Sequence, residues 1–556
     1  MVNKDRQKEG HRQRIVELAA ILVFVLISIF LLVSSLLQTD SSQITPIIDA
    51  SIKATAFAMP NNGWAPLTVY FSAFGSKSTN GAIVSYEWDL DGNGSFETDA
   101  TANNGYTFYT YSKAGDYVIS MRATDVNGGA AQASTLVSVR LPASSSVDYW
   151  SVFDDSQVRR VDISLNKKDW EKMWENPENK YQVQADAVVF GEELQDVGFR
   201  MRGQFSLINS GDKKPWKIDI DAYIDGQEYK NLRQLMFLNS IGDPSLLKEK
   251  LAYEMMDFSG LPASHVSFVE LWIDIIDDTQ DSVFWGVYAM VERVDNKYIG
   301  NRFGGDAKGG NLYKASHAQR GPMDLIYYGD TIEEYPMQNG QYAYGKMNNE
   351  DEGDYSDIVD LCRTINGTVN QSEADYIQAL EANINMDAFL RYLAVNAVID
   401  NWDSYINTGN NFYLFNNPVS GRFEWIPWDL TWGENSQAEL FSGNEMGMME
   451  SAPLFERAMT IEKYRNAYTA YLDLLSRFWF TSENMTSRIR KYHNMIAPYV
   501  SQSSGDKGFF GNDSMFPFGA FQESPTQLIN FVDQRINYLQ TAIDEELSTK
   551  PITNER

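Results

Sequence analysis

The sequence predicts a multidomain chain: an N-terminal transmembrane helix, then an all-β sandwich, then a large α+β domain in two lobes. Three observations support this order. Leu18 to Leu37 carry no charge, short runs of alternating apolar residues follow, and a strand-rich segment and then a helix-rich segment fill the remaining length. A chain of 556 residues is too long for one hydrophobic core, so two or three domains are expected.

The composition excludes several classes of function. A net charge of −29 disfavours binding to nucleic acid, although much of the acidic surplus simply solvates the surface. The single cysteine, Cys362, forms no disulfide within the chain, which suits a prokaryotic exterior. A zinc hydrolase needs clustered ligands, and the four histidines are far apart in the sequence. No G-x-S-x-G motif of a serine hydrolase occurs either. Carboxylates are therefore expected to carry any chemistry.

The apolar run at 18–37 is long enough to span a bilayer. Residues 1–17 form a basic tail before it, and a polar stalk at 38–50 follows. By the positive-inside rule, the N-terminus is cytoplasmic and the later domains are extracellular. A cleaved signal peptide is the alternative; the long run and the lack of an A-x-A site favour an anchor.

Residues 51–141 alternate with the period of a β-strand, for example at Leu67–Phe71, Tyr117–Met121 and Leu136–Val139. Short strands separated by Gly, Asn and Asp turns predict an antiparallel, Ig-like sandwich. The segments Ala65–Phe71, Ser85–Gly92 and Thr124–Gly129 resemble a PKD (polycystic kidney disease) domain. The resemblance implies an extracellular spacer or ligand-binding module with Trp88 buried between its sheets.

Asp89, Asp91 and Asn93 alternate through a glycine turn, as Ca²⁺ ligands do. However, position 100, where such a loop carries a bidentate Glu, is Ala100. Asp and Asn are also ordinary turn residues, so a turn is favoured over a calcium site.

A linker at 142–157 leads to the large domain at 158–547, and 548–556 form a tail. Alternating or apolar runs predict strands in the first half of this domain. They lie at 158–164, 184–189, 197–202, 216–221, 268–275 and 284–293. Apolar residues at helical spacing predict helices at 245–258, 464–478, 483–496 and 526–546, and one that leads to Asp400. Such a division suggests two lobes around a cleft.

The segment from Asp400 to Gly433 is the most informative. A polar loop is followed by a predicted hairpin, with strands at 412–415 and 423–426. Since a hairpin brings its ends together, Asp403, Asn411 and Asp429 are expected to lie close to one another. Two carboxylates and an amide can hold a hard cation and supply a base, as phosphoryl transfer requires. The same residue types also serve as turn residues, so spacing alone leaves both interpretations open.

This segment resembles the CotH (spore coat protein H) kinase family, an atypical protein kinase family. The resemblance extends from 158 to 547. It rests on Asn401–Asp403, Asn411–Phe415, Trp425–Leu430, Arg202-Gly203, Lys213–Ile218, Asp243–Ala252, Trp285–Tyr288, Glu292–Asp295, Gly310–Lys314 and Phe531–Leu539.

The resemblance implies an extracytoplasmic Ser/Thr kinase that uses ATP with Mg²⁺ or Mn²⁺ on a surface or secreted protein, such as a Ser-rich one. Asp403 would position the acceptor hydroxyl, and Asp429 and Asn411 would hold the metal. Lys217 and Arg202 would contact the phosphates, with Lys214 as a rival. The segment Val287–Glu292 would form the strand edge that binds adenine through its backbone groups, with Trp428 or Tyr288 stacking on the base. Glu254 would pair with the lysine, unless it is an ordinary solvated carboxylate.

Two departures from the family pattern are visible. Lys248 stands where the family often has Arg, and Leu430–Gly433 lack a further Asp that the family often has. Two other functions stay open: a non-catalytic surface adhesion protein on the same fold, and a glycosidase built on paired carboxylates. No residue here separates a general acid from a nucleophile, so the glycosidase ranks last.

Overall fold

The computed structural model describes residues 51–141, 146–276, 281–367, 371–443, 447–501, 516 and 518–548. The expected membrane anchor at 18–37 and its flanking segments lie outside these residues. Among the described residues, no helix is both long enough and apolar enough to cross a membrane.

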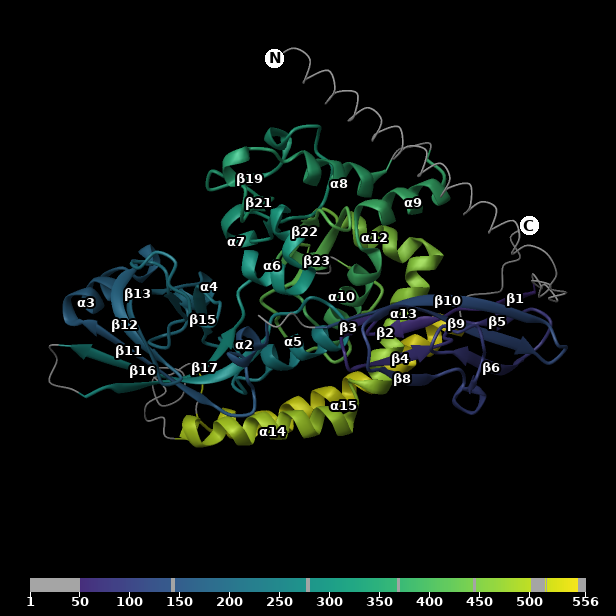
Figure 1. Cartoon of the computed structure of the whole chain (residues 1–556), viewed down its shortest axis with the longest axis horizontal. Coiled ribbons are helices and arrows are strands. Elements are labelled where there is room, and N and C mark those ends of the chain that lie inside the picture. Colours follow the sequence, from purple (N-terminus) through teal and green to yellow (C-terminus); the bar gives the residue numbers. More distant parts are fainter. Residues whose placement is uncertain are drawn as a thin grey trace, which may run out of the picture. The chain divides into compact units, whose positions relative to one another are not determined.

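Residues 51–141 form a β-sandwich, as the alternating runs indicate (Figure 1). One sheet has the order β3-β10-β9-β6-β7, the second has the order β2-β4-β8, and β1 pairs with β5. Trp88 is completely buried between the sheets, 5.4 Å from the Phe71 ring, and its indole N–H donates to the Gly105 carbonyl. The strands are β1 (Ile52–Lys53), β2 (Phe57–Met59), β3 (Asn62–Trp64), β4 (Leu67–Ser72), β5 (Lys77–Ser78), β6 (Ile83–Asp89), β7 (Thr98–Asp99), β8 (Thr107–Tyr111), β9 (Gly115–Asp125) and β10 (Ala130–Arg140).

The first half of the large domain closes into a seven-stranded barrel in the order β11-β12-β13-β14-β15-β17-β16. Its interior is filled by a separate apolar cluster that includes Phe199, Trp216 and Phe237. The strands are β11 (Arg159–Asn166), β12 (Val183–Val189), β13 (Glu192–Met201), β14 (Trp216–Asp219), β15 (Gln234–Leu238), β16 (Val266–Ile276) and β17 (Val283–Val291). The six predicted strands are all present; the barrel closure and β15 were not predicted.

The second half is mainly helical around a small sheet in the order β21-β18-β22-β23. The predicted hairpin is present as β22 (Phe412–Asn417) and β23 (Arg422–Pro427). The predicted helices appear as α5 (Lys248–Phe258), α10 (Met386–Val398), α13 (Glu462–Phe478), α14 (Ser482–Ser501) and α15 (Phe518–Ser548); α14 and α15 lie side by side in Figure 1. The barrel half also contains α3 (Lys167–Glu175) and α4 (Phe205–Ile208). The other elements of the second half are α6 (Asn296–Phe303), β18 (Leu312–Lys314), α7 (His317–Arg320), β19 (Met337–Gln338), β20 (Gln341–Tyr342), β21 (Gly345–Lys346), α8 (Ser356–Asn366), α9 (Glu373–Asn383), α11 (Tyr405–Thr408) and α12 (Pro453–Thr460).

Helix α5 begins three residues later than its sequence suggests. The Asp243 carboxylate accepts the N–H groups of Ser245 and Lys248, at 2.8 and 2.9 Å. These bonds hold the intervening residues in a turn and provide an acceptor for the first helical N–H. Gly260, just beyond the end of the helix, has a φ of +73°, as expected of a residue that ends a helix.

The stretch expected to be a linker is partly folded. Helix α2 (Ser146–Ser151) carries Tyr149, which is fully buried in the barrel cluster. Its hydroxyl donates a hydrogen bond to the Glu292 carboxylate. Tyr149 therefore anchors this part of the chain to the barrel. The polar residues around it in the sequence did not indicate this contact.

Sandwich and helical half are joined by specific contacts. The Tyr70 ring stacks on Phe478 of α13 at 4.7 Å. Asn61 Nδ2 donates to Asp387 at the start of α10, at 2.6 Å. Met59, on β2, is completely buried in the core cluster of the large domain. The sandwich therefore packs as part of this unit through both apolar and polar contacts.

His265 should make the fold sensitive to acid. Burial and the nearby cations Arg302 and Lys250 lower the pKa of its imidazole well below the usual value. In the unfolded chain the His265 imidazole binds a proton near pH 6.5, whereas in the folded protein it stays neutral at that pH. The free energy of unfolding therefore falls as the pH drops below about 6.5. We expect His265→Phe to reduce this slope, by up to about 1.4 kcal/mol per pH unit, in urea unfolding between pH 7.5 and 5.5. An unchanged slope would contradict a buried neutral imidazole.

Candidate active site

The polar loop after α10 holds Asp403 in a fixed position. Its carboxylate accepts hydrogen bonds from the Thr408 hydroxyl at 2.8 Å and from Asn411 Nδ2 at 2.8 Å. Asn410 Nδ2 adds a longer contact at 3.3 Å. The side chain is half-buried, so it stays accessible while these donors orient it.

The hairpin places Asn411 and Asp429 at its open end. Phe412 pairs with Pro427, so Asn411 precedes β22 at the end where Asp429 follows β23. Both residues have left-handed backbone conformations, with φ of +61° and +50°, which end the ladder and turn the chain. Burial raises the pKa of the Asp429 carboxyl, and the negative charge of Asp403 adds a smaller contribution in the same direction. Asn411 contacts Asp403 directly, and the hairpin register brings Asn411 and Asp429 to the same end; the roles of all three residues remain predictions.

Asp429 is exposed to solvent, although many protein atoms surround its carboxyl group. Loss of bulk hydration raises the pKa of its carboxyl, and Arg202 and Lys314 oppose this shift. Its backbone N–H donates to the buried Tyr253 hydroxyl at 3.0 Å. Together, the oxygens of Asp403, Asn411 and Asp429 are the hard donors that Mg²⁺ and Mn²⁺ prefer. The donor set therefore fits the implied metal.

Arg202, just after β13 of the barrel, and Lys314, on β18, lie within electrostatic reach of Asp429. Burial lowers the pKa of Lys314, on β18, to about 8; repulsion from Arg202 and Arg293 adds to this, and Asp429 opposes it. Burial likewise lowers the pKa of Lys217, on β14, to about 8, against its 2.8 Å ion pair with Asp219. The positive charge of Arg293 contributes to the lowered pKa of both Lys217 and Lys314, so Arg293 lies within electrostatic reach of each.

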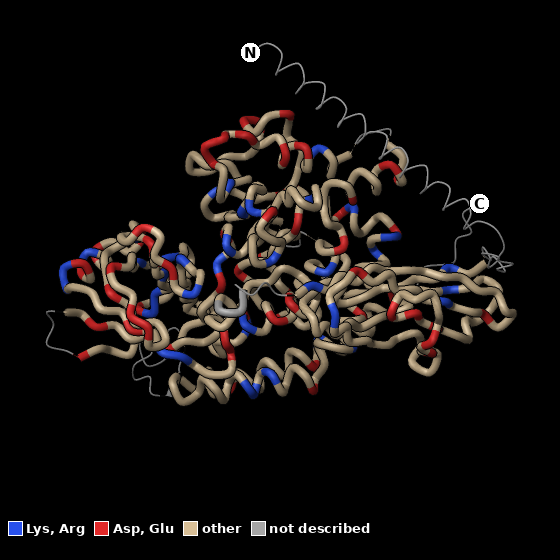
Figure 2. The backbone as a smooth tube through the Cα atoms, in the orientation of Figure 1, with Lys and Arg blue, Asp and Glu red and all other residues tan. Residues whose placement is uncertain are grey.

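This concentration of positive charge contrasts with the rest of the molecule. Figure 2 shows Asp and Glu gathered around the loops near β19 and β21, where Glu350, Asp351 and Glu352 are exposed. Such exposed residues fit the solvated acidic surface inferred from composition. Cations beside Asp429 instead form a place where phosphate groups would be stabilised.

Trp428 contacts Lys314, one of these cations. It is almost fully buried, with the Lys314 ammonium 5.3 Å from its ring and the Tyr413 ring in an edge contact at 5.6 Å. The aromatic residue thus supports a site cation. Its proposed stacking on adenine remains a prediction.

Glu249 is a member of the site that the sequence did not indicate. It lies in the first turn of α5, and its Oε1 is buried with no hydrogen-bond donor among the described residues. Burial raises the pKa of its carboxyl well above the usual value; Asp429 adds to this, and Arg202 opposes it. Tyr253, four residues later on the same face of α5, accepts the Asp429 N–H.

Glu254, the acid suggested from the sequence, faces elsewhere. It forms ion pairs with Lys250 at 3.1 Å and with Arg488 of α14 at 2.7 Å, and it accepts the Tyr492 hydroxyl proton. Positions five apart on a helix lie on different faces, so Glu249 and Glu254 cannot both point into the cleft. The suggested pairing of Glu254 with Lys217 is replaced by these contacts.

Glu292 and the strand before it also differ from expectation. The Glu292 carboxylate is completely buried and accepts hydrogen bonds from Tyr149, the His265 N–H and Arg302, the last at 2.7 Å. Ala289 to Val291 pair with β15 on one side and β16 on the other. These three residues therefore present no open strand edge to adenine, whereas Val287 and Tyr288 pair with β16 and lie outside the pairing with β15. Lys214, the rival lysine, donates to the Leu207 carbonyl at 2.7 Å.

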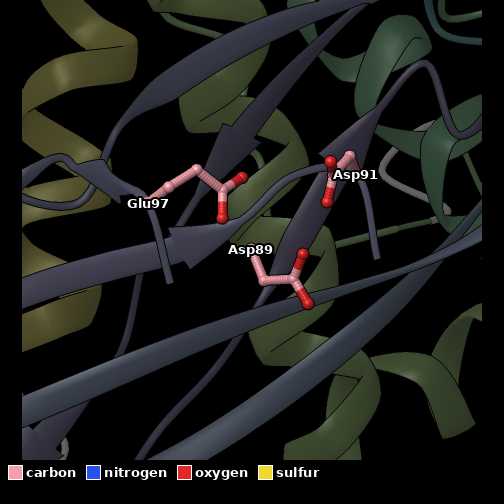
Figure 3. A group of neighbouring side chains, drawn as sticks. All are labelled: Asp89, Asp91 and Glu97. Carbon is pink, nitrogen blue, oxygen red and sulfur yellow. The ribbon is translucent and has the colours of Figure 1, made fainter. Parts of the chain in front are cut away.

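The sandwich contains a separate acidic group. Carboxylate oxygens of Asp89, Asp91 and Glu97 lie within 4.8 Å of one another (Figure 3). Asp89 accepts hydrogen bonds from the N–H groups of Gly92 and Gly94, both at 2.8 Å. The side chain of Asn93 donates from Nδ2 to Asp91 and accepts the Ser95 N–H with Oδ1. Glu97 therefore joins Asp89 and Asp91 as a candidate ligand, and the loop has the hydrogen bonds expected of a turn.

Comparisons with known proteins agree with this architecture. The CotH kinase protein family model matches residues 199–539, and the PKD domain model matches residues 51–139. Inner spore coat protein H of Bacillus subtilis is 24% identical over 349 residues, which cover 62% of this chain and 86% of that protein. Invasin CotH3 of Rhizopus delemar is 21% identical over 322 residues, 55% of this chain, and the chain spans half (50%) of that protein.

Two solved PKD domains are similar to a part of this chain. The PKD1 domain from the Vibrio cholerae metalloprotease PrtV is 26% identical and matches 16% of this chain and 96% of that domain, with a TM-score of 0.13. The PKD1 domain of Vibrio anguillarum Epp is 25% identical over the same shares, with a TM-score of 0.14.

Proposed function

Because this chain belongs to the CotH kinase protein family, we propose that it transfers the γ-phosphate of ATP to Ser or Thr hydroxyls of a surface or secreted protein. The observation that carries the proposal is the meeting of two groups of opposite charge. Asp403, Asn411 and Asp429 provide oxygen donors, and Arg202 and Lys314 lie within electrostatic reach of Asp429. Phosphoryl transfer needs both.

Each side chain has a defined task in this reaction. Asp403 accepts a hydrogen bond from the acceptor hydroxyl and takes its proton as the new O–P bond forms and the bond to the β-phosphate oxygen breaks, releasing ADP. Asp429 and Asn411 would hold a divalent metal, which would supply charge neutralisation for the phosphate oxygens. Arg202, Lys314 and Lys217 orient the phosphate chain. Asp403 is suited to its task because its three donors keep it in one orientation.

The proposal places this chemistry outside the cell. The uncharged run at 18–37, preceded by a basic tail, supports a single-pass anchor with an external C-terminal part. A non-catalytic surface-binding protein is the second candidate, supported by a family relative that is named an invasin.

One experiment separates the two functions. The purified protein, given γ-labelled ATP and Mg²⁺ or Mn²⁺, should label itself or casein, a Ser-rich acceptor, and a chelator should stop the labelling. The label should be recovered as phosphoserine or phosphothreonine. A protein that neither binds ATP in calorimetry nor transfers label would sink the kinase proposal and leave the binding function.

A further inference from the structure

A concave site that includes neither Asp403 nor Asp429 lies where the sandwich meets the helices. It is a groove of about 950 Å³, lined by residues 103–108 of the sandwich, 476–482 at the junction of α13 and α14, and 533–540 of α15. Its walls are held together by polar contacts. The Tyr106 hydroxyl donates to Asp473 at 2.7 Å, and Arg477 forms an ion pair with the same carboxylate at 2.9 Å. The groove is therefore formed before any ligand arrives.

The groove combines an open aromatic ring with free amides. Phe108 is 63% exposed, although its ring lies 6.1 Å from that of Tyr70. Asn103 and Asn104 on the sandwich and Asn537 and Gln540 on α15 also line the groove. Within the part of the chain that the structure describes, none of these four amide side chains has a hydrogen-bond partner. Each offers donors and an acceptor to a ligand.

The charges in the groove exclude strongly ionic ligands. Arg477 is neutralised by Asp473, and Asp533 is the other charged residue in the lining. A polyanion would meet no unpaired cation, and a lipid chain would desolvate the amides without replacing their hydrogen bonds. An occupant must therefore be neutral, rich in hydroxyl groups and flat enough on one face to cover a phenyl ring.

We propose that this groove binds a neutral oligosaccharide. The C–H face of one sugar ring would stack on Phe108, while the amides on both sides exchange hydrogen bonds with sugar hydroxyls, whose donor and acceptor character they match. The two walls come from different domains, so the sandwich and α15 must both be present for binding. This site would hold the protein on a surface glycan, independently of ATP.

The test uses calorimetric titration of the full chain with cellohexaose, chitohexaose and maltohexaose. At least one should bind, and Phe108→Ala and Asn537→Ala should each weaken that binding tenfold or more. Phe205→Ala is the matched control, because Phe205 is an exposed phenylalanine outside the groove, and it should bind like wild type. Unchanged thermal unfolding would show that the variants are folded.

Three outcomes would overturn the proposal. These are no binding of any of the three oligosaccharides, binding that Phe108→Ala leaves intact, or tighter binding of dextran sulfate than of the neutral sugars. None of them depends on nucleotide, so this site and the kinase proposal can fail separately.

Discussion

Asp403→Asn and Asp429→Asn should each lower the rate of phosphoryl transfer by about 10³-fold, the order of effect expected when a positioned acid–base or electrostatic group is removed. Both changes keep the shape of the side chain and remove its charge. The hydrogen bond that the structure gives Asp429 comes from its backbone N–H, and an asparagine at 403 can still accept from Thr408. The fold should therefore survive, and the loss should be chemical.

The two variants should differ in how they fail. Asp403→Asn should lower kcat with little change in the affinity for ATP and metal, because its task is at the acceptor hydroxyl. Asp429→Asn should also raise the Mg²⁺ or Mn²⁺ concentration needed for half-maximal activity, because it removes a charge from the metal site. Asp360→Asn, an exposed carboxylate ion-paired with Arg363, is the control and should act as wild type. If Asp403→Asn kept more than a tenth of the wild-type rate, Asp403 would not be the group that positions the hydroxyl.

Glu292→Ala should destabilise the protein by about 3–5 kcal/mol, the cost of leaving one partner of a buried ion pair alone. Glu292 is completely buried, and Arg302, its partner, is 9% exposed. Without the carboxylate, the guanidinium is left inside the protein, and the Tyr149 hydroxyl and His265 N–H lose their acceptor. Urea unfolding monitored by circular dichroism would measure the change.

A matched control comes from an exposed carboxylate. Glu462 pairs with Lys53 at 2.8 Å, but both side chains are about half exposed, so Glu462→Ala should cost less than about 1 kcal/mol. Folded Glu292→Ala protein should bind ATP with wild-type affinity, since the carboxylate is enclosed by protein groups. A specific loss of ATP affinity without loss of stability would restore the nucleotide role first expected for Glu292.

Local patterns predicted the hairpin that carries part of the candidate site. A turn between two strand-like runs implied the hairpin of β22 and β23, and pairing within one hairpin is enough to bring Asn411 and Asp429 to the same end. Asp403 lies beside Asn411 because the loop after α10 is short. These relations depend on residues that are close in sequence, so their geometry can be derived without the rest of the fold.

The cations and Glu249 could not be found in this way. Lys314 and Arg202 are more than 100 residues apart in the sequence, and their meeting beside Asp429 results from packing of the barrel against the β18 sheet. Glu249 and Glu254 are equally plausible from spacing, because the rotation of α5 about its axis is set by contacts with α14. The burial of Glu292 likewise depends on α2, which lies in a segment expected to be a linker.

The sequence by itself determined the order of the domains, the strands of the sandwich, and the hairpin with its three oxygen donors. Short-range periodicity and turn chemistry carry that information, since they act over a few residues. The tertiary structure alone decided which cations face Asp429, which glutamate of α5 enters the cleft, and that Glu292 belongs to a buried ion pair. It alone also revealed the groove beside Phe108. Each of these depends on how distant surfaces pack together, and no pattern along a single segment specifies that packing.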